Sequence, residues 1–417
     1  MASLLAQRMK APDMRNVNGI QLLNLIVEYG PLSRASLAKL SRLSKPTVSE
    51  QVQRLIALGT VVELGEGESS ATGGKRPTML AFHANTGHVG AVSIGPGLTR
   101  ISVSNLVGEP KGSLEFPTLA ADGPRSLIRR ISAALSKLAL DKSAASPAGI
   151  REALRAIGVG VPGRVDCSRG TVLELGNVFN WRNVDLATPL SRRFDCPVLV
   201  DNDVNVALVA ELNHGGARDV RSAVLIRLDI GMGAAIAMDR KIHHGSHWAA
   251  GEVGHLIPTR TAIDEKSMRG HMETIVGSDK IAARVRKAAR RVPALRGLLK
   301  TKSPIAALFE AAPRDSTAFA IAEEITGHLC AAVSQHALVC DPETLLLSGE
   351  VFEHVLPEIQ SFLARTIPWF PRVALAELGE DAVLKGATDL ALASSYGQLS
   401  RELQMYDSGL AMAAAGA

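Results

Sequence analysis

Residues 33–58 have the sequence SRASLAKLSRLSKPTVSEQVQRLIAL, which predicts two short helices joined by a tight turn. Ser33 and Ser44 stand where the helices begin, and a serine hydroxyl can accept the N–H groups exposed there. Pro46 fits the first turn of the second helix, which needs no intrahelical N–H at that point. That helix is expected to end at Gly59, because glycine readily adopts the left-handed conformation that closes many helices.

The two helices differ in which residues they can bury. On the second helix, an apolar stripe at helical spacing consists of Val48, Val52, Leu55 and Ile56. On the first helix, Leu37 and Leu40 are expected to point inward, with Leu43 filling the turn. This is the layout of a helix-turn-helix, whose second helix enters the major groove of DNA by its N-terminal end. The alternative is a two-helix hairpin inside a larger core.

The flanking sequence favours a DNA-binding domain. Residues 18–28 predict a preceding amphipathic helix, and residues 61–64 and 78–80 predict two strands around a Gly/Ser-rich loop, which together form a β-hairpin wing. On the second helix, the residues expected to contact base edges are Lys45, Thr47, Ser49 and Glu50. The residues expected to contact phosphates or a neighbouring minor groove are Arg54 and, on the wing, Lys75 and Arg76.

The charge distribution agrees with this assignment. The 417 residues are enough for two or three domains. Residues 1–82 hold ten basic and six acidic side chains and so supply four of the five net positive charges, where phosphate binding needs them. A second basic cluster at residues 280–291 is expected to be the solvated face of a helix, with a DNA contact as the alternative. An aromatic content of 4% argues against a stacking platform for single strands.

The sequence contains neither a recognisable targeting signal nor a closely spaced pair of cysteines. No apolar run has the length of a membrane span, and residues 1–10 lack the order of a signal peptide, so we expect a cytoplasmic protein. The cysteines are scattered and form no C-x-x-C pair, so we expect reduced, mostly buried thiols rather than a thiolate zinc site or disulfides. They are Cys167, Cys196, Cys330 and Cys340.

Beyond a linker at residues 83–88, predicted strands alternate with helices. Three strands, a helix, and then a strand and a helix are expected before residue 221, and a similar order begins again near Ser222. This order is typical of an actin-like or hexokinase-like half-domain, an α/β architecture of the ribonuclease H-like kind. The predicted domains are a winged helix-turn-helix at 1–82, a first lobe at 83–221, a second lobe with a closing helix at 222–407, and a tail without order at 408–417.

Several segments between residues 16 and 399 resemble the ROK family (repressors, open reading frames and kinases). The matching segments are residues 73–77, 156–163, 176–181, 201–205, 250–255 and 270–273. The resemblance implies that a sugar is contacted by Asn177, Asn202, Asp203, Glu252, His255 and Glu273. It also implies that Asp203 stands at the position of the kinases' general base. Carboxylates and amides suit a sugar, because each hydroxyl left unpaired costs affinity. Taken singly, Asn202 could instead cap a helix and His255 could be an interior histidine.

The phosphate-binding loops depart from the family's kinases. Those kinases open with Asp-x-Gly-Gly-Thr, where residues 93–97 here are SIGPG, and they carry Gly-Thr-Gly-x-Gly where residues 229–233 are DIGMG. Residues 348–350 keep only part of the glycine turn on the nucleotide side. A phosphate cradle works through convergent donors, and here a carboxylate, an N–H and hydroxyls are lost. The sequence therefore predicts no useful kinase activity, which leaves Asp203 a vestigial base.

The family's zinc site is also incomplete. His255 remains, but the three cysteine positions are occupied by Asp264, Lys266 and His271. A lysine ammonium repels a cation, so we expect neither a metal nor a cofactor. A three-ligand site made by His255, Asp264 and His271 is the alternative.

Two functions fit these residues. The first is a transcriptional regulator, with repression as the family default, whose degenerate kinase domain senses a sugar or sugar derivative. The second is an active ROK sugar kinase that carries a DNA-binding head. The altered phosphate loops favour the first, and the retained sugar-contact residues argue against a third, a regulator that answers only to a protein partner. The expected partners are a pseudo-palindromic, A·T-rich double-stranded operator, the sugar effector and further copies of the chain, as a homodimer or a dimer of dimers.

Overall fold

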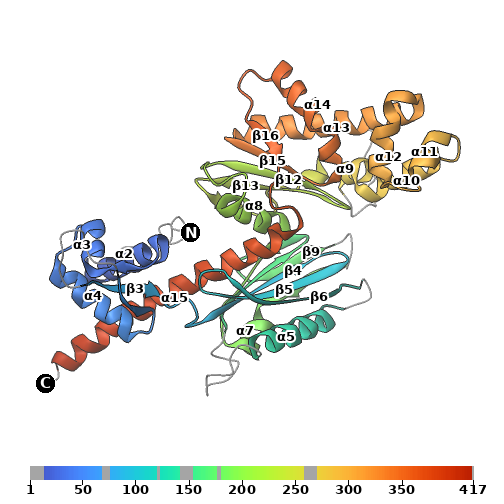
Figure 1. The fold of residues 1–417 in the computed structure, drawn as a ribbon. Helices are drawn as coiled ribbons and strands as arrows, with labels where there is room; N and C mark the ends of the chain where they lie inside the picture. The colour runs from blue at the N-terminus through green and yellow to red at the C-terminus, as the bar shows by residue number, and fades with distance from the viewer. Residues whose placement is uncertain are drawn as a thin grey trace.

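The structure is a computed structural model that describes residues 14–67, 76–119, 123–140, 154–175, 180–257 and 270–415 (Figure 1). An N-terminal domain and two lobes lie along one long helix, α15 (Ala382–Ala415). Of the residues singled out from the sequence, those outside the described ranges are Lys75, Asn177, Asp264 and Lys266.

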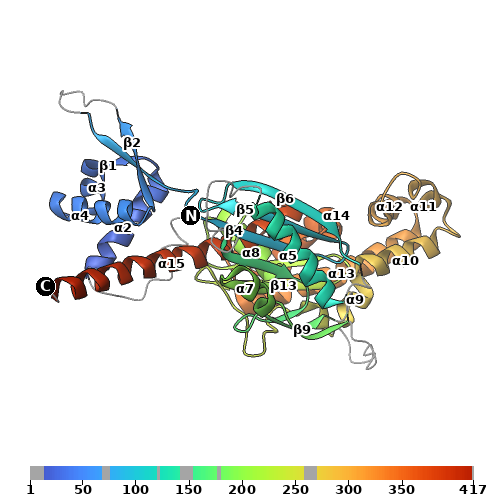
Figure 2. The ribbon, with the colours of Figure 1, turned by 90° about the horizontal axis from the view of Figure 1, so that it is seen from below.

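The N-terminal domain is the predicted winged helix-turn-helix. Its helices are α2 (Met14–Tyr29), α3 (Arg34–Ser41) and α4 (Lys45–Ala57). Its sheet has the order β1-β3-β2, from β1 (Leu32–Ser33), β3 (Thr78–Phe82) and β2 (Val61–Glu66), and the last two extend as the wing (Figure 2).

Both predicted helix caps are confirmed. The Ser33 hydroxyl accepts the Ser36 N–H at 3.0 Å, and the Ser44 hydroxyl accepts the Thr47 N–H at 3.3 Å. Gly59 has a φ of 68°, the left-handed conformation expected just past α4.

The expected burial of Leu40 is wrong. Leu37 is fully buried, whereas Leu40 is 48% exposed. The buried positions of this eight-residue helix are Leu37 and Ser41, one turn apart, and the Ser41 hydroxyl donates to the Leu37 carbonyl oxygen. At about 100° per residue, Leu40 lies about 60° from Leu37 on the side away from Ser41, so it falls at the edge of the narrow buried face.

The first lobe is built on a five-stranded mixed sheet of order β11-β7-β4-β5-β6. Its strands are β4 (His88–Ile94), β5 (Leu98–Asn105), β6 (Pro110–Pro117), β7 (Leu154–Val161) and β11 (Val198–Asn202). Helices α5 (Pro124–Leu140) and α7 (Ala187–Phe194) pack on one face and α15 packs on the other, while α8 (Asp203–His214) lies between the lobes, packed on α15 and on the sheet of the second lobe. A small sheet of β8 (Arg164–Asp166), β9 (Thr171–Leu175) and β10 (Trp181–Asp185) adjoins the lobe.

The second lobe repeats this topology with the sheet order β14-β13-β12-β15-β16. Its strands are β12 (Ala223–Leu228), β13 (Met232–Met238), β14 (Lys241–Ile242), β15 (Thr344–Ser348) and β16 (Arg372–Leu375). In each lobe the central strand has a parallel neighbour on one side and an antiparallel one on the other. The predicted duplication of an actin-like half-domain is confirmed.

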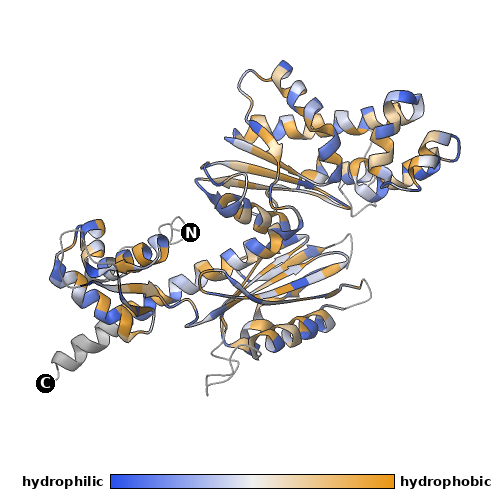
Figure 3. Cartoon of the chain, in the orientation of Figure 1, coloured by the Kyte–Doolittle hydropathy of each residue, from blue (hydrophilic) through white to orange (hydrophobic). Residues whose placement is uncertain are grey.

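Helices cover the outer face of the second lobe's sheet and gather at one end of it (Figure 1). They are α9 (His271–Val276), α10 (Ser278–Ala288), α11 (Pro293–Leu298), α12 (Pro304–Ala311), α13 (Ser316–Cys340) and α14 (Glu350–Thr366). Apolar residues lie mainly in the sheets and on the helix faces turned towards them (Figure 3). The basic cluster at residues 280–291 falls on and just after α10, where Arg284 pairs with Glu324 at 2.6 Å.

Helix α15 differs from the expected closing helix in its length and its contacts. It packs mainly on α8 and on β4 and β7 of the first lobe, although the sequence-based division grouped it with the second lobe. It continues to Ala415 through most of the segment expected to lack order. Leu403, 2% exposed, lies in the core of the N-terminal domain beside Ile20 and Leu23. One helix therefore joins the first lobe to the helix-turn-helix.

In the part of the chain that the structure describes, no helix is both long and apolar enough to cross a bilayer.

We expect Leu403→Ala to loosen the N-terminal domain, because it empties a buried position in that domain's core. The expected loss is about 2–5 kcal/mol of local stability, measured by hydrogen exchange of α2 and α4 amides. Leu40→Ala removes the same atoms from an exposed site and should change stability by less than about 0.5 kcal/mol. Equal effects of the two substitutions would show that α15 does not dock as described.

Candidate functional site

A cleft of about 560 Å³ opens between the two lobes. It brings together all the described residues that the resemblance assigned to sugar contacts, from both lobes. They are Asn202, Asp203, Glu252, His255 and Glu273. The carboxyl ends of β7 and β11 reach this cleft, as expected for ligand sites in sheets of this kind.

Asn202 is the N-cap of α8, so the helix-cap interpretation is correct. Its side-chain oxygen accepts the N–H groups of Val204 at 2.8 Å and Asn205 at 3.3 Å. Its amide nitrogen donates to the Gly163 carbonyl oxygen at 2.9 Å. Because an amide nitrogen carries two hydrogens, a rigidly held Asn202 can still offer the second to a ligand hydroxyl.

Asp203 is the first residue of α8 and faces Arg227 on β12, with 3.8 Å between the Asp203 Oδ2 and Arg227 Nη1 atoms. Burial raises the pKa of Asp203, and the Arg227 charge opposes that rise. Sequence reasoning missed Arg227, which also lines the cleft. The available signal was a single arginine within the otherwise apolar strand AVLIRL.

Glu252 and His255 lie at the two ends of the short turn at Val253–His255 and are exposed to the cleft. Desolvation by the surrounding protein raises the pKa of Glu252, because it disfavours the charged carboxylate. The nearby His255 opposes this rise in pKa, and the charges of Glu273 and Asp203 increase it. The interior-histidine interpretation of His255 is therefore wrong. Both side chains are accessible to a ligand.

Glu273 is 7% exposed, and its carboxylate has a structural role. Its Oε1 atom accepts the Met232 N–H at 3.0 Å, and its Oε2 atom accepts the Gly270 N–H at 3.1 Å. The carboxylate thus ties the start of β13 to the start of α9.

The altered phosphate loops border the same cleft. Pro96 and residues 229–233 line it, and Pro96 has no N–H to offer. The Asp229 carboxylate accepts the Ser278 hydroxyl at 3.2 Å, so a negative group stands at the loop that would hold phosphate in a kinase. The cleft therefore keeps its sugar-type side chains beside a poor phosphate cradle.

On the N-terminal domain, Lys45, Ser49 and Glu50 are exposed on α4, and Thr47 is half-buried. Arg54 is half-buried and donates to the Gln51 side-chain oxygen at 3.0 Å, so part of its guanidinium is engaged within the domain. Arg76 is exposed at the loop end of the wing, just before β3 begins. The DNA contacts of these residues remain predictions.

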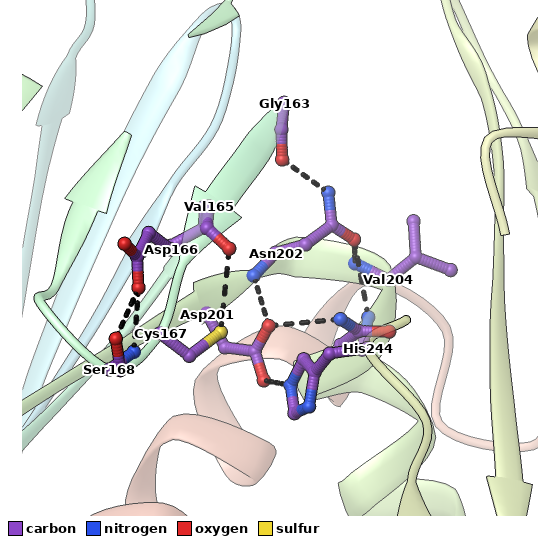
Figure 4. Close-up of polar contacts among 10 residues, drawn as sticks. Gly163, Val165, Asp166, Cys167, Ser168, Asp201, Asn202, Val204 and His244 are labelled. Atoms are coloured by element: carbon purple, nitrogen blue, oxygen red, sulfur yellow. Dashed lines mark hydrogen bonds and ion pairs between the residues drawn. The ribbon is translucent and has the colours of Figure 1, made fainter. Parts of the chain in front are cut away.

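Metal-type ligands gather away from the family's zinc positions. Of the degenerate zinc positions, His255 lies in the cleft and His271 begins α9. A different set, which sequence reasoning missed, comes together on the other side of β11: Cys167, Asp201 and His244 (Figure 4).

A winged helix-turn-helix joined to two ribonuclease H-like lobes around a polar cleft defines a class: DNA-binding proteins built on a sugar-kinase-like domain. Comparison with family models identifies the family. The ROK family model matches residues 132–394, and a winged helix-turn-helix DNA-binding model matches residues 15–62. The chain belongs to the ROK family.

Named relatives are regulators. The chain is 33% identical over 242 residues to a xylose repressor of Caldicellulosiruptor bescii, covering 58% of this chain and 59% of that one. It is 26% identical over 362 residues to the DNA-binding transcriptional dual regulator NagC of Escherichia coli, covering 84% of each. The chain thus spans about three-fifths of the length of the xylose repressor.

Solved structures support the same fold. A ROK family transcriptional regulator described as a homolog of the E. coli MLC protein superposes with a TM-score of 0.74 at 22% identity, covering 93% of this chain and 98% of that one. A ROK hexokinase from Thermus thermophilus superposes with a TM-score of 0.58 at 20% identity, covering 75% and 99%. The lobes are thus shared by regulators and kinases, and only the first of these two matches spans nearly the whole chain.

We expect Glu273→Gln to lower the free energy of unfolding by about 1–3 kcal/mol, because an amide cannot accept at both of its former oxygen positions. Glu252→Gln, at the exposed cleft position, should change it by less than about 0.5 kcal/mol. Urea denaturation of the two variants measures the difference. If the two variants had the same urea midpoint, the structural role assigned to Glu273 would be wrong.

Proposed function

We propose that the protein is a cytoplasmic DNA-binding transcriptional regulator, a repressor, whose ROK domain senses a sugar without phosphorylating it. One observation carries the proposal: sugar-type side chains from both lobes converge on a cleft whose phosphate loops are altered, in a chain that also holds a helix-turn-helix. The named relatives are regulators as well.

The charges of the cleft favour an uncharged sugar as the effector. Five carboxylates line it, at Glu174, Asp203, Asp229, Glu252 and Glu273, against two arginines. Arg227 lies 3.8 Å from Asp203 and Arg164 lies 3.8 Å from Glu174, so the arginines face carboxylates already. A phosphorylated sugar would meet the remaining negative groups, and such like-charge contacts oppose binding. One relative, the xylose repressor, is named after an uncharged sugar.

The DNA partner we propose is a pseudo-palindromic operator contacted by a homodimer. Lys45, Thr47, Ser49 and Glu50 would contact base edges from the N-terminal half of α4, while Arg54, Lys75 and Arg76 would contact phosphates or a minor groove. Each subunit would occupy one half-site, with centres about one helical turn apart.

The test is an operator titration with the full chain. An operator is first selected from a random duplex library, and effectors are screened by thermal shift with xylose, glucose, N-acetylglucosamine and their phosphates. Wild type should release DNA with one of the uncharged sugars. Asp203→Asn should need about 5–150-fold more of it, since one charged acceptor is lost (~1–3 kcal/mol). Operator affinity without sugar should not change.

Asp239→Asn is the matched control, because Asp239 is exposed at the β13–β14 turn, outside the cleft lining. It should respond to sugar as wild type does. If Asp203→Asn released DNA at the wild-type sugar concentration, the cleft would not be the sensor site.

The kinase alternative predicts a different result. Pro96 and Asp229 remove donors and add charge where phosphoryl transfer needs electrostatic stabilisation. Coupled assays with ATP, magnesium and the same uncharged sugars should therefore stay at background. Turnover of about 1–100 per second, ordinary for kinases, would establish the enzyme instead.

A further inference from the structure

Three side chains of different chemistry converge on the side of β11 opposite the sugar-type cleft (Figure 4). The Cys167 sulfur, a carboxylate oxygen of Asp201 and a ring nitrogen of His244 all lie within 4.8 Å of one another. The His244 Nε2 atom is 2.8 Å from Asp201 Oδ2. Asp201 and Asn202 are successive strand residues, so their side chains point to opposite faces, and Asp201 turns away from the cleft that Asn202 lines.

The carboxylate in this cluster is held in place from its far side. The Asp201 Oδ1 atom accepts the Asn202 N–H at 2.7 Å and the Asn205 side-chain amide at 2.9 Å. These bonds leave Oδ2 directed at the other two members of the cluster. Metal-binding carboxylates are typically oriented by such outer hydrogen bonds. The His244 ring packs edge-on against Trp248, with centroids 5.5 Å apart.

The cluster borders a second cavity, of about 430 Å³, between β11, α8 and α15. All three side chains line it, so a fourth ligand such as water has room beside them. The three come from different parts of the fold: Cys167 follows β8, Asp201 lies on β11, and His244 follows β14. The first two belong to the first lobe and the third to the second, so the cluster joins the lobes.

We propose that Cys167, Asp201 and His244 form a binding site for a transition-metal ion of the zinc class, bridging the two lobes. A sulfur, a nitrogen and an oxygen donor together suit Zn²⁺ or Co²⁺, whereas Mg²⁺ and Ca²⁺ prefer oxygen alone. Bond lengths of about 2.0–2.3 Å place tetrahedral donors roughly 3.3–3.6 Å apart, so small side-chain rotations suffice. The assignment departs from the expectation of no metal, which considered only the family's zinc positions.

Binding of the ion changes the protonation of Cys167 and His244. The metal-bound sulfur must be a thiolate, so Cys167 loses its proton to solvent when the ion binds. His244 must present Nε2 without a proton, and the hydrogen that now points at Asp201 moves to Nδ1 or leaves. Without an ion, burial and the Asp201 charge raise the pKa of the Cys167 thiol well above its usual range, which keeps it neutral. A bound cation offsets the repulsion between a Cys167 thiolate and the Asp201 carboxylate, so the thiol can lose its proton.

The test uses the full chain, stripped of metal with a chelator and kept reduced with a phosphine. Co²⁺ is titrated in and absorption is recorded, because a cobalt–thiolate bond gives a charge-transfer band that histidine and carboxylate ligands alone do not. We expect one Co²⁺ per chain, the charge-transfer band, and displacement of Co²⁺ by Zn²⁺. Absence of the band in wild type overturns the proposal and leaves the cluster a hydrogen-bonded trio.

Variants locate the ion. Cys167→Ser should abolish the band, while Cys340→Ser, at another half-buried cysteine, should keep it. Asn205→Ala should weaken Co²⁺ binding about 10–100-fold through the freed Asp201 carboxylate. His255→Asn should have no effect. Binding that survives Cys167→Ser but is lost in His255→Asn would place the ion in the cleft and overturn the assignment, whatever the outcome for the proposed sugar response.

Discussion

The close contact of α15 with β7 and α8 is the constraint on which the arrangement of the molecule depends. A side-chain carbon at Gly158 would lie 1.9 Å from the Ala387 carbonyl oxygen, and one at Gly386 would lie 1.9 Å from the Val206 carbonyl oxygen. Non-bonded carbon and oxygen atoms do not approach each other so closely, so no side chain fits at either position. Glycine at both positions lets backbone pack against backbone, and this fixes the direction in which the long helix leaves the first lobe.

That direction carries the helix into the DNA-binding domain. Further along the helix, the Tyr396 hydroxyl donates to the Leu106 carbonyl oxygen, and Glu402 pairs with Arg155 at 3.0 Å. Leu403 then enters the core of the helix-turn-helix. The same helix contacts α8, whose first residue, Asp203, lines the cleft. The cleft and the DNA-binding domain are therefore connected through the packed helices α8 and α15, not only through the linker that follows β3.

Local patterns predicted well what local physics determines. The caps at Ser33 and Ser44, the repeated strand order and the convergence of the cleft residues followed from turn chemistry, periodicity and motif. What failed depends on distant partners. Leucine favours a helix and is apolar on either side of α3, so the sequence alone does not show which way Leu40 points. Its exposure depends on how this eight-residue helix packs against the rest of the domain. The cluster around His244 unites three segments, and no sequence spacing marks residues that meet across two lobes.

The anchoring of the DNA-binding domain limits how the proposed sugar signal can travel. A sugar that contacts both lobes favours the arrangement that brings them together, and it shifts the population by no more than its differential affinity. Closure moves the second lobe relative to the first, but α15 holds the helix-turn-helix to the first. Two subunits joined through their first lobes would therefore keep the spacing of their recognition helices. Closure alters that spacing only when the subunits meet through their second lobes, where Trp369 and Val339 are 71% and 83% exposed. A coupling of about 1–3 kcal/mol through such an interface is enough for a 5–150-fold change in operator affinity.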